Sequence, residues 1–221
     1  MKFIKFVSEF LKHPKQVGAV AESSPFLARK MVRQIGGAAN IVEFGPGTGA
    51  VTKEILRHLP KDGKLTCFEI NPSFCEQLKT INDPRLKVIN DDVKNCGRYV
   101  DNLDCIVSSL PLAAFDESEK EKVLALSGKS RTYVQFQYHP FLKSKLKRYF
   151  RDVKIKFVPL NIPPAFVYVS KNPRHKAIRS EYRSQRKAQR DIFSRQVTRT
   201  TLRISLVYAN IGALLSKILK A

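Results

Sequence analysis

The sequence is poor in several residue types that would mark particular protein classes. It has 221 residues with no tryptophan, two methionines and four cysteines, and its 19 acidic residues stand against 40 basic ones. The cysteines form no C-x-x-C pair, which argues against a zinc site and indicates scattered reduced thiols. No apolar run reaches the roughly 20 residues of a membrane span. We predict a cytoplasmic protein from these reduced thiols, and the N-terminal stretch lacks the continuous apolar core and cleavage site of a secretory signal.

The excess of basic residues gives a formal net charge of +21. A surface of this charge attracts polyanions, which means nucleic acid or an anionic membrane, and the net charge alone does not separate the two. The hydrophobic fraction of 43% is ordinary for a globular protein. The length suits one α/β domain with appended segments and is sufficient to bury a core.

One stretch, IVEFGPGTGAVTKEIL at residues 41–56, has the pattern of a strand, a tight turn and a helix. Its first residues suit a buried strand, and its later apolar residues recur at helical spacing. Glycines at positions 45, 47 and 49 can adopt positive φ and let a ligand approach the backbone. The helix start that follows offers unpaired N–H groups and a positive dipole end to a polar or anionic group.

The spacing of these glycines fits two classes of nucleoside ligand. Gly45, Gly47 and Ala50 satisfy the relaxed dinucleotide pattern G-x-G-x-x-G/A. Gly45, Gly47 and Gly49 satisfy the G-x-G-x-G pattern of S-adenosylmethionine sites. A glycine-rich turn that binds nothing is the third interpretation, and the turn alone does not decide among them.

Strand-like and helix-like stretches alternate along the chain after this turn, which predicts a parallel sheet with helical crossovers. The connection NIPP between the last two strands is too short for a helical crossover, so these strands should pair antiparallel. We predict an α/β fold with a Rossmann-like, seven-stranded, mostly parallel sheet that ends in an antiparallel hairpin. The predicted strands lie at 41–44, 64–70, 86–90, 103–111, 132–138, 153–160 and 165–171, and further helices at 73–81, 117–127 and 141–150.

Two carboxylates are expected near the glycine turn. Glu69 ends the second predicted strand, where a carboxylate can accept both ribose hydroxyls of a nucleoside. Asp92 follows the third strand, where it can hydrogen-bond an adenine amino group, although Asp91 and Asp92 also suit a helix N-cap or a turn. Parallel strands bring both carboxylates, and the SSLPL segment after the fourth strand, to the edge at which open α/β folds bind ligands. No second glycine turn appears after residue 100, so S-adenosylmethionine is favoured over a dinucleotide.

These motifs resemble those of the class I S-adenosylmethionine-dependent methyltransferases. The sequence is more closely similar to the bacterial phospholipid N-methyltransferases, which convert phosphatidylethanolamine stepwise to phosphatidylcholine. The resemblance spreads over residues 1–172 and is specific as a set. Its pieces are VGAVAESSPFLARKMV (17–32), VEFGPGTGAVTKEIL (42–56), VSSLPL (107–112), VQFQY (134–138) and IPPAFVYV (162–169).

The resemblance implies S-adenosyl-L-methionine as the cofactor and a phospholipid as the substrate, and no metal ligand is predicted. The implied cofactor-binding residues are Glu43, Gly45, Gly47, Thr48, Gly49, Glu69, Ile70, Asp92, Val93 and Ser108. The residues implied near the substrate and its entrance are Ser23, Ser24, Ser109 and Pro111.

The amine of phosphatidylethanolamine is largely protonated at neutral pH and must lose a proton before it attacks a methyl group. Tyr138 and His139 follow the fifth predicted strand, and they are the candidates for accepting this proton or for orienting the headgroup. The alternative interpretation is an ordinary core-edge tyrosine followed by a turn histidine. Lys or Arg should contact the headgroup phosphate, but the sequence does not single out one of them.

The rRNA adenine dimethyltransferases share the glycine turn, the acidic positions and the basic character, and they suggest an rRNA adenine N6-methyltransferase as the alternative function. After the fourth strand they have a pattern Asn-Leu-Pro-Tyr, which holds the adenine amine and stacks on its ring. This sequence has Ser109, Leu110, Pro111 and Leu112 there, so both the amide and the aromatic ring are missing. Nucleic acid is therefore the less favoured partner. A non-catalytic basic adaptor for membranes or RNA is the third hypothesis.

Residues 1–35 precede the predicted methyltransferase domain at 36–172 and carry two helical patterns. In the first, Phe3, Phe6 and Phe10 share one face while the lysines lie mostly elsewhere, which is typical of a basic helix in a membrane interface. A helix that packs this face on its own domain is an equally common alternative. The apolar face favours a membrane over nucleic acid, because nucleic-acid binding needs the cations without the phenylalanines.

Residues 173–221 are predicted to form a basic helical tail that ends in the apolar stretch 204–219. These 16 residues rise only about 24 Å as a helix, less than the hydrocarbon core of a bilayer. A solvated helix face is the alternative for the basic part. We expect the chain to be cytoplasmic and peripherally associated with the inner membrane, through the first helix and this tail.

Overall fold

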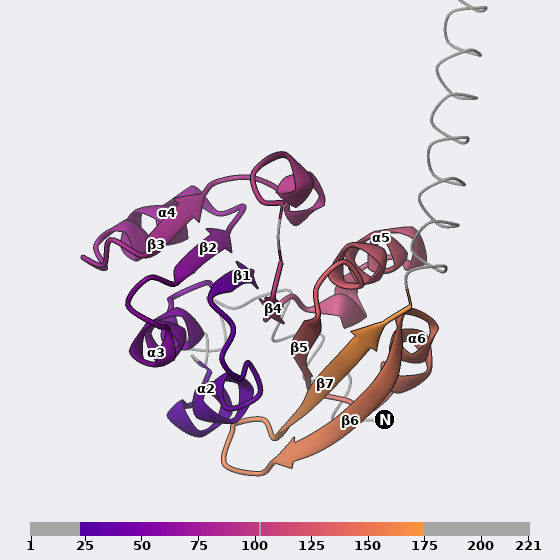
Figure 1. Ribbon diagram of the computed structural model, residues 1–221. Coiled ribbons are helices and arrows are strands. Elements are labelled where there is room, and N and C mark those ends of the chain that lie inside the picture. The colour runs from indigo at the N-terminus through magenta and orange to yellow at the C-terminus, as the bar shows by residue number, and fades with distance from the viewer. Residues whose placement is uncertain (1–22, 102, 175–221) are drawn as a thin grey trace, which may run out of the picture. The chain divides into compact units, whose positions relative to one another are not determined.

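The structure is a computed structural model that describes residues 23–101 and 103–174 (Figure 1). The predicted interfacial helix with Phe3, Phe6 and Phe10 lies outside the described residues, and so does the basic tail beyond residue 174. Within the described ranges, no helix is long and apolar enough to cross a membrane.

A sheet of seven strands organises the fold, with the spatial order β3-β2-β1-β4-β5-β7-β6 (Figure 1). The strands are β1 (Asn40–Phe44), β2 (Lys64–Phe68), β3 (Leu86–Ile89), β4 (Cys105–Ser108), β5 (Thr132–Gln137), β6 (Phe150–Val158) and β7 (Ala165–Pro173). The first five strands pair in parallel, and β7 pairs antiparallel with both β5 and β6. The predicted mostly parallel sheet with an antiparallel C-terminal hairpin is confirmed.

Side-chain caps mark the starts of several helices, among them α2 and α5. Ser24 caps α2, and its Oγ accepts a hydrogen bond from the Leu27 N–H at 3.1 Å. Asp116 caps α5 in the same way, accepting from the Glu119 N–H at 2.7 Å. The helices are α2 (Pro25–Val32), α3 (Ala50–His58), α4 (Pro72–Lys79), α5 (Glu117–Ser127) and α6 (Lys143–Tyr149), with short 3₁₀ helices η1 (Val93–Arg98) and η2 (Leu112–Ala114). The two 3₁₀ helices are too short for a periodic pattern to predict them.

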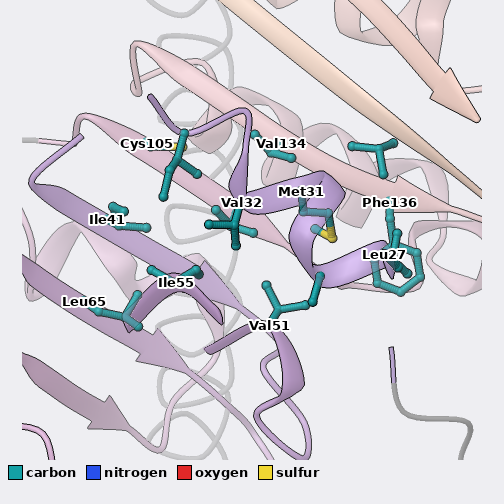
Figure 2. Packing of buried hydrophobic residues seen from close by; sticks show 14 of the residues in the cluster. Leu27, Met31, Val32, Ile41, Val51, Ile55, Leu65, Cys105, Val134 and Phe136 are labelled. Carbon is teal, nitrogen blue, oxygen red and sulfur yellow. The ribbon is translucent and has the colours of Figure 1, made fainter. Parts of the chain in front are cut away.

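Helices cover both faces of the sheet, so each face has its own apolar core. Helices α2 and α3 cover one face and α5 and α6 the other. Figure 2 shows the first core, where side chains of α2 and α3 meet those of the central strands. Its buried members include Leu27, Met31, Val32, Ile41, Val51, Ile55, Leu65, Cys105, Val134 and Phe136. Helix α2 thus belongs to the core of the sheet, and the domain boundaries expected after residues 35 and 172 stay predictions.

Parallel pairing brings the residues that follow the strands to one edge of the sheet. The Gly45 N–H donates to the last carbonyl of β2 at 3.0 Å, and the Glu69 N–H donates to the last carbonyl of β3 at 3.1 Å. The Ser109 N–H donates to the last carbonyl of β1 at 2.9 Å. The antiparallel pairing of Gln137 with Phe166 places the β6–β7 loop at this edge as well. The site predicted from the sequence should therefore assemble here.

Helix α2 provides a test of the first core. We expect Leu27→Ala to lower the free energy of unfolding by about 2–5 kcal/mol, because the fully buried side chain leaves a cavity. Denaturant titration followed by circular dichroism measures the change. Lys53→Ala, at an exposed position on α3, is the control and should stay within about 0.5 kcal/mol of the unaltered chain. A loss of less than about 1 kcal/mol for Leu27→Ala would contradict the packing of α2 in the core.

Candidate active site

The glycine turn after β1 is open above its middle residue. Gly47 has a φ of +56°, and a Cβ added there would meet no atom within 4 Å. At Gly45 an added Cβ would lie 2.9 Å from Leu110 Cδ2, and at Gly49 it would lie 2.9 Å from Leu78 Cδ2. The outer glycines therefore let neighbouring side chains pack against the turn, while Gly47 leaves room for a ligand over the backbone.

Helix α3 follows the turn directly, so its N-terminus lies beside the open space over Gly47. Thr48 is half-buried in the turn, and Gly49 precedes the helix at its N-cap position. The first intrahelical bond runs from the Lys53 N–H to the Gly49 carbonyl at 3.0 Å. The N–H groups of residues 50–52 precede this ladder and are therefore available to an anionic or polar ligand group, which the helix dipole also favours.

Glu69 connects the glycine turn to the end of β2. One carboxylate oxygen, Oε2, accepts from the Gly47 N–H at 3.1 Å, and Oε1 accepts from the Asn71 N–H at 2.9 Å. The side chain is only 7% exposed. Each carboxylate oxygen can accept a second hydrogen bond, so the pair can still receive two ribose hydroxyls.

Glu43, predicted at the cofactor, lies wholly buried below the turn, on the face that α3 covers. Its Oε2 accepts from Thr52 Oγ1 at 2.7 Å and from Cys67 Sγ at 3.3 Å, while Oε1 has no partner among the described residues. Burial raises the pKa of the Glu43 carboxyl to about 7, against the lowering effect of these two hydrogen bonds. Its contact with the cofactor stays a prediction, and the structure places it as a support of the turn from the core side.

Asp92 lies at the start of η1, where its carboxylate accepts from the Lys94 N–H at 2.9 Å. Asp91 accepts from Asn95 Nδ2 at 2.8 Å and from the Tyr99 hydroxyl at 2.9 Å, and these hydrogen bonds lower the pKa of the Asp91 carboxyl. Both aspartates therefore make the N-cap and turn bonds that the sequence offered as an alternative. The other oxygen of Asp92, Oδ2, forms an ion pair with Lys94 Nζ at 2.9 Å, and the side chain is 40% exposed, so a ligand would share this carboxylate with Lys94. The neighbouring predicted residue, Val93, is buried.

Large apolar side chains are exposed beside these carboxylates. Ile70, next to Glu69, is 71% exposed, and Tyr99 is 45% exposed. The Tyr99 ring packs edge to face on Phe68, with 5.7 Å between ring centroids. Exposed Ile70 and Tyr99 near hydrogen-bonding carboxylates suit a flat heteroaromatic ring such as adenine.

The loop after β4 is held by two buried glutamines of β5. The Nε2 groups of Gln135 and Gln137 both donate to the Leu110 carbonyl, at 3.1 and 2.9 Å. Ser108 is buried, and Ser109 and Pro111 are half-buried in the same loop. Sequence reasoning missed the glutamines as positioning residues. The sequence does contain a signal for them. Gln135 and Gln137 alternate along a strand that is otherwise largely apolar and buried, where a polar side chain needs a hydrogen-bond partner.

Tyr138 and Ser24, predicted on separate elements, are both linked to Asn161 in the β6–β7 loop. Burial raises the pKa of the Tyr138 hydroxyl, and a hydrogen bond with the Asn161 side chain lowers it. The Ser24 N–H donates to Asn161 Oδ1 at 3.0 Å, and Ser24 Oγ donates to the Leu160 carbonyl at 2.8 Å. Ser23 precedes this cap and is half-buried. The predicted entrance residues 23 and 24 therefore lie at the carboxyl edge of the sheet.

His139 follows Tyr138 and stacks its ring on Phe141, with 5.3 Å between centroids. Its Nδ1 is buried and has no hydrogen-bond partner in the described part of the chain. Burial, together with the positive charge of Lys120, lowers the pKa of the His139 imidazole. The ring is therefore neutral at pH 7 and can accept a proton.

The arrangement fits S-adenosylmethionine. The open space over Gly47 adjoins the start of α3, which can hold the charged methionine end. Glu69 keeps capacity for two ribose hydroxyls, and Asp92 with the exposed Ile70 can hold the adenine. Together with the strand order, these features define a class I S-adenosylmethionine-dependent methyltransferase.

Comparison with known proteins agrees with this class. A profile of the ribosomal RNA adenine dimethylase family matches residues 2–112. An ornithine lipid N-methyltransferase of Singulisphaera acidiphila is 32% identical over 183 residues, which cover 75% of this chain and 94% of that protein. The chain therefore belongs to the ribosomal RNA adenine dimethylase family, and it is a methyltransferase that uses S-adenosylmethionine as its cofactor.

Solved structures share the fold at low sequence identity. The N-methyltransferase NodS of Bradyrhizobium japonicum WM9, in complex with S-adenosyl-L-homocysteine, has a TM-score of 0.55 at 14% identity, over 68% of this chain and 89% of that one. The magnesium protoporphyrin IX methyltransferase of Synechocystis PCC 6803, with bound S-adenosylmethionine, has a TM-score of 0.54 at 8% identity, over 67% of this chain and 79% of that one.

Gly47→Val tests the cofactor pocket. We expect it to abolish cofactor binding and methyl transfer, because the side chain would fill the space over the turn. Isothermal calorimetry with S-adenosylmethionine measures binding. Gly36→Val is a matched control, since Gly36 has a similar φ of +61° and equally open surroundings but precedes β1 at the opposite edge of the sheet. It carries the same backbone strain, of about 1–3 kcal/mol, and should still bind. Turnover retained in Gly47→Val would contradict the pocket.

Proposed function

We propose that this methyltransferase acts on the amine headgroup of phosphatidylethanolamine and its methylated derivatives, at the membrane surface, and so forms phosphatidylcholine. The supporting relative is named for N-methylation of a lipid, and it aligns over nearly its whole length. A lipid amine is thus a chemically consistent acceptor for the same arrangement of turn, carboxylates and loop. Phosphatidylethanolamine in particular is the acceptor that the phospholipid N-methyltransferase resemblance favours.

The loop after β4 is the observation that carries the choice of a lipid over a nucleic-acid base. Leu112 is only 1% exposed and packs in the core on the α5 and α6 face, so its side chain does not stack on a base. Leu110 lies against Gly45, and its carbonyl is occupied by the two glutamine amides. Serine at position 109 offers a hydroxyl in place of an amide. The loop therefore supports a small amine better than a flat heterocycle.

Methyl transfer needs little acid–base chemistry, because bound S-adenosylmethionine supplies a methyl group on an already activated sulfonium. The task of the chain is to align the nucleophile and exclude water. Glu69 and the turn hold the cofactor side, and the loop anchored by Gln135 and Gln137 borders the acceptor side.

The remaining step is removal of a proton from the ammonium headgroup. His139 is our first candidate for the acceptor, because it follows β5 at the carboxyl edge of the sheet, is only half-buried and has a neutral imidazole. Tyr138 is better suited to orienting the headgroup, since burial keeps its hydroxyl protonated.

A lipid substrate requires the enzyme to reach a bilayer. We propose a cytoplasmic enzyme that associates peripherally with the inner membrane, where the net charge of +21 favours anionic lipids. The N-terminal helix and the basic C-terminal tail stay predicted contacts. An rRNA adenine N6-methyltransferase is the second candidate, and the family profile over residues 2–112 favours it.

A labelling experiment separates the two candidates. We expect the purified chain to transfer radiolabelled methyl groups from S-adenosylmethionine into vesicles of phosphatidylethanolamine and an anionic lipid. A parallel reaction contains rRNA that lacks its own methyl marks. Counting the lipid extract and the RNA fraction gives the result, and label confined to RNA would overturn the lipid assignment.

His139→Gln tests the proton acceptor. The pKa of His139 lies below the ordinary histidine value of about 6.5. For the unaltered chain, we expect the rate of methyl transfer to show an additional loss as the pH falls through this pKa, because a protonated imidazole cannot accept a proton from the headgroup. The variant should be slower by about 10²–10⁴-fold at pH 7 and lack this additional loss. His58→Gln, on the last turn of α3, is the control and should keep the parental profile. An unchanged rate in His139→Gln would assign the histidine to structure alone.

A further inference from the structure

A surface pocket of about 360 Å³ lies between α2 and the end of β6, apart from the cofactor site. It is lined by Phe26, Arg29, Lys30, Arg33, Phe157, Val158, Pro159 and Leu160. The lining thus combines three cations with aromatic and aliphatic side chains and includes no acidic residue. An ordinary solvated surface mixes charges of both signs, so this composition indicates an anionic, partly apolar partner.

The apolar part of the pocket is unusually exposed. Phe26 is 51% exposed, Phe157 53% and Leu160 60%, and Ile162, two residues after Leu160 in the β6–β7 loop, is 83% exposed. Phe157 is supported from beside by the Phe166 ring, with 5.2 Å between centroids, so it is held at the surface. Contiguous exposed apolar side chains of this kind mark interaction with a protein or a membrane.

The cations are arranged along α2 beside this apolar surface. Arg29 and Lys30 lie in the last turn of the helix, and Arg33 is its C-cap residue. The Arg29 guanidinium lies over the Phe26 ring, 5.5 Å from its centroid. No described acidic side chain forms an ion pair with any of the three. Within residues 23–101 and 103–174, therefore, no carboxylate neutralises the charge of these three cations.

Hydrogen bonds fix the two walls of the pocket to each other and to the candidate active site. Ser24 donates to the Leu160 carbonyl and to Asn161 Oδ1, so the start of α2 is fastened to the β6–β7 loop. Asn161 in turn shares a hydrogen bond with Tyr138 at the end of β5. The pocket therefore exists before any partner binds, and its β6 wall ends at the same edge of the sheet as the glycine turn.

We propose that this pocket and its rim dock the enzyme on an anionic lipid bilayer. Phe157, Leu160 and Ile162 enter the interfacial region, while Arg29, Lys30 and Arg33 contact anionic headgroups. A bilayer fits better than nucleic acid, because exposed aliphatic residues such as Leu160 and Ile162 gain little from phosphates or stacked bases. This inference rests on the proposed function in one respect: docking would bring the carboxyl edge of the sheet, with the candidate active site, to a lipid acceptor in the bilayer.

Vesicle sedimentation tests the contribution of the cations. The full-length chain is mixed with vesicles of phosphatidylglycerol and phosphatidylcholine, without S-adenosylmethionine. We expect the combined Arg29→Glu, Lys30→Glu and Arg33→Glu variant to partition at least about tenfold more weakly. The matched control combines Lys61→Glu, Lys64→Glu and Arg151→Glu, the same charge change at exposed positions near the starts of β2 and β6. An equal loss in both variants would overturn the docking site.

The absence of tryptophan from the sequence allows a second, local test. Phe157→Trp introduces a single fluorophore on the rim, and its emission should shift to shorter wavelength when these vesicles are added. Lys61→Trp, at an exposed position before β2, should not shift. No shift at position 157, or an equal shift with a single-stranded RNA oligonucleotide, would overturn the proposal. The latter result would instead assign the surface to nucleic acid.

These measurements are independent of the acceptor, because neither vesicle lipid carries a methylatable amine. Failure of the proposed function would appear in a different experiment, methyl transfer by the unaltered chain to phosphatidylethanolamine dispersed in detergent micelles. Absence of methyl transfer there, with vesicle partition intact, would reject the acceptor and leave the docking site standing. Transfer to micelles without the position-157 shift would reject the docking site alone.

Discussion

Parallel pairing of five strands is the constraint on which the site depends. It places the ends of β1, β2, β3, β4 and β5 at one edge, and backbone hydrogen bonds extend the alignment into the loops beyond. Residues far apart in the sequence, such as Gly47 and Glu69, meet in one hydrogen bond for this reason. A slip of one residue in any strand would turn its side chains to the opposite face and separate these groups.

The two glutamates nearest the turn illustrate how position decides the role of a carboxylate. Glu69 accepts two backbone N–H groups and keeps further lone pairs toward the edge of the sheet. Glu43 lies wholly inside, and burial raises the pKa of its carboxyl to about 7. A buried carboxylate that holds Thr52 and Cys67 from below can stabilise the turn, whereas Glu69 is positioned to contact a ligand directly.

Much of the fold was predictable because its elements have strong local patterns. The alternating apolar strands, the glycine turn and the short NIPP connection each have a steric or hydrogen-bonding cause that acts over a few residues. The positions of Glu69 and Asp92 followed from parallel topology. The contact of Glu43 with Thr52 of α3 was not predictable, since strand alternation tells which residues share a face but not which face α3 covers.

Features built from distant segments could not be predicted from the sequence, because local patterns do not tell which segments meet in the fold. Gln135 and Gln137 act through the carbonyl of Leu110, and nothing local connects them. The surface pocket lies between α2 and the end of β6, which are more than a hundred residues apart in the sequence. Among 40 basic residues, only the three-dimensional arrangement singles out Arg29, Lys30 and Arg33 beside an exposed apolar rim.

The central claim is that the methyl group passes to the nitrogen of a lipid headgroup. Its most direct test is nuclear magnetic resonance of the product after transfer of an isotope-labelled methyl group from S-adenosylmethionine to phosphatidylethanolamine vesicles. The proposed function predicts labelled N-methyl signals from the headgroup, progressing toward the trimethylated form. Headgroup signals without label, while adenine N6 of added rRNA becomes labelled, would contradict it.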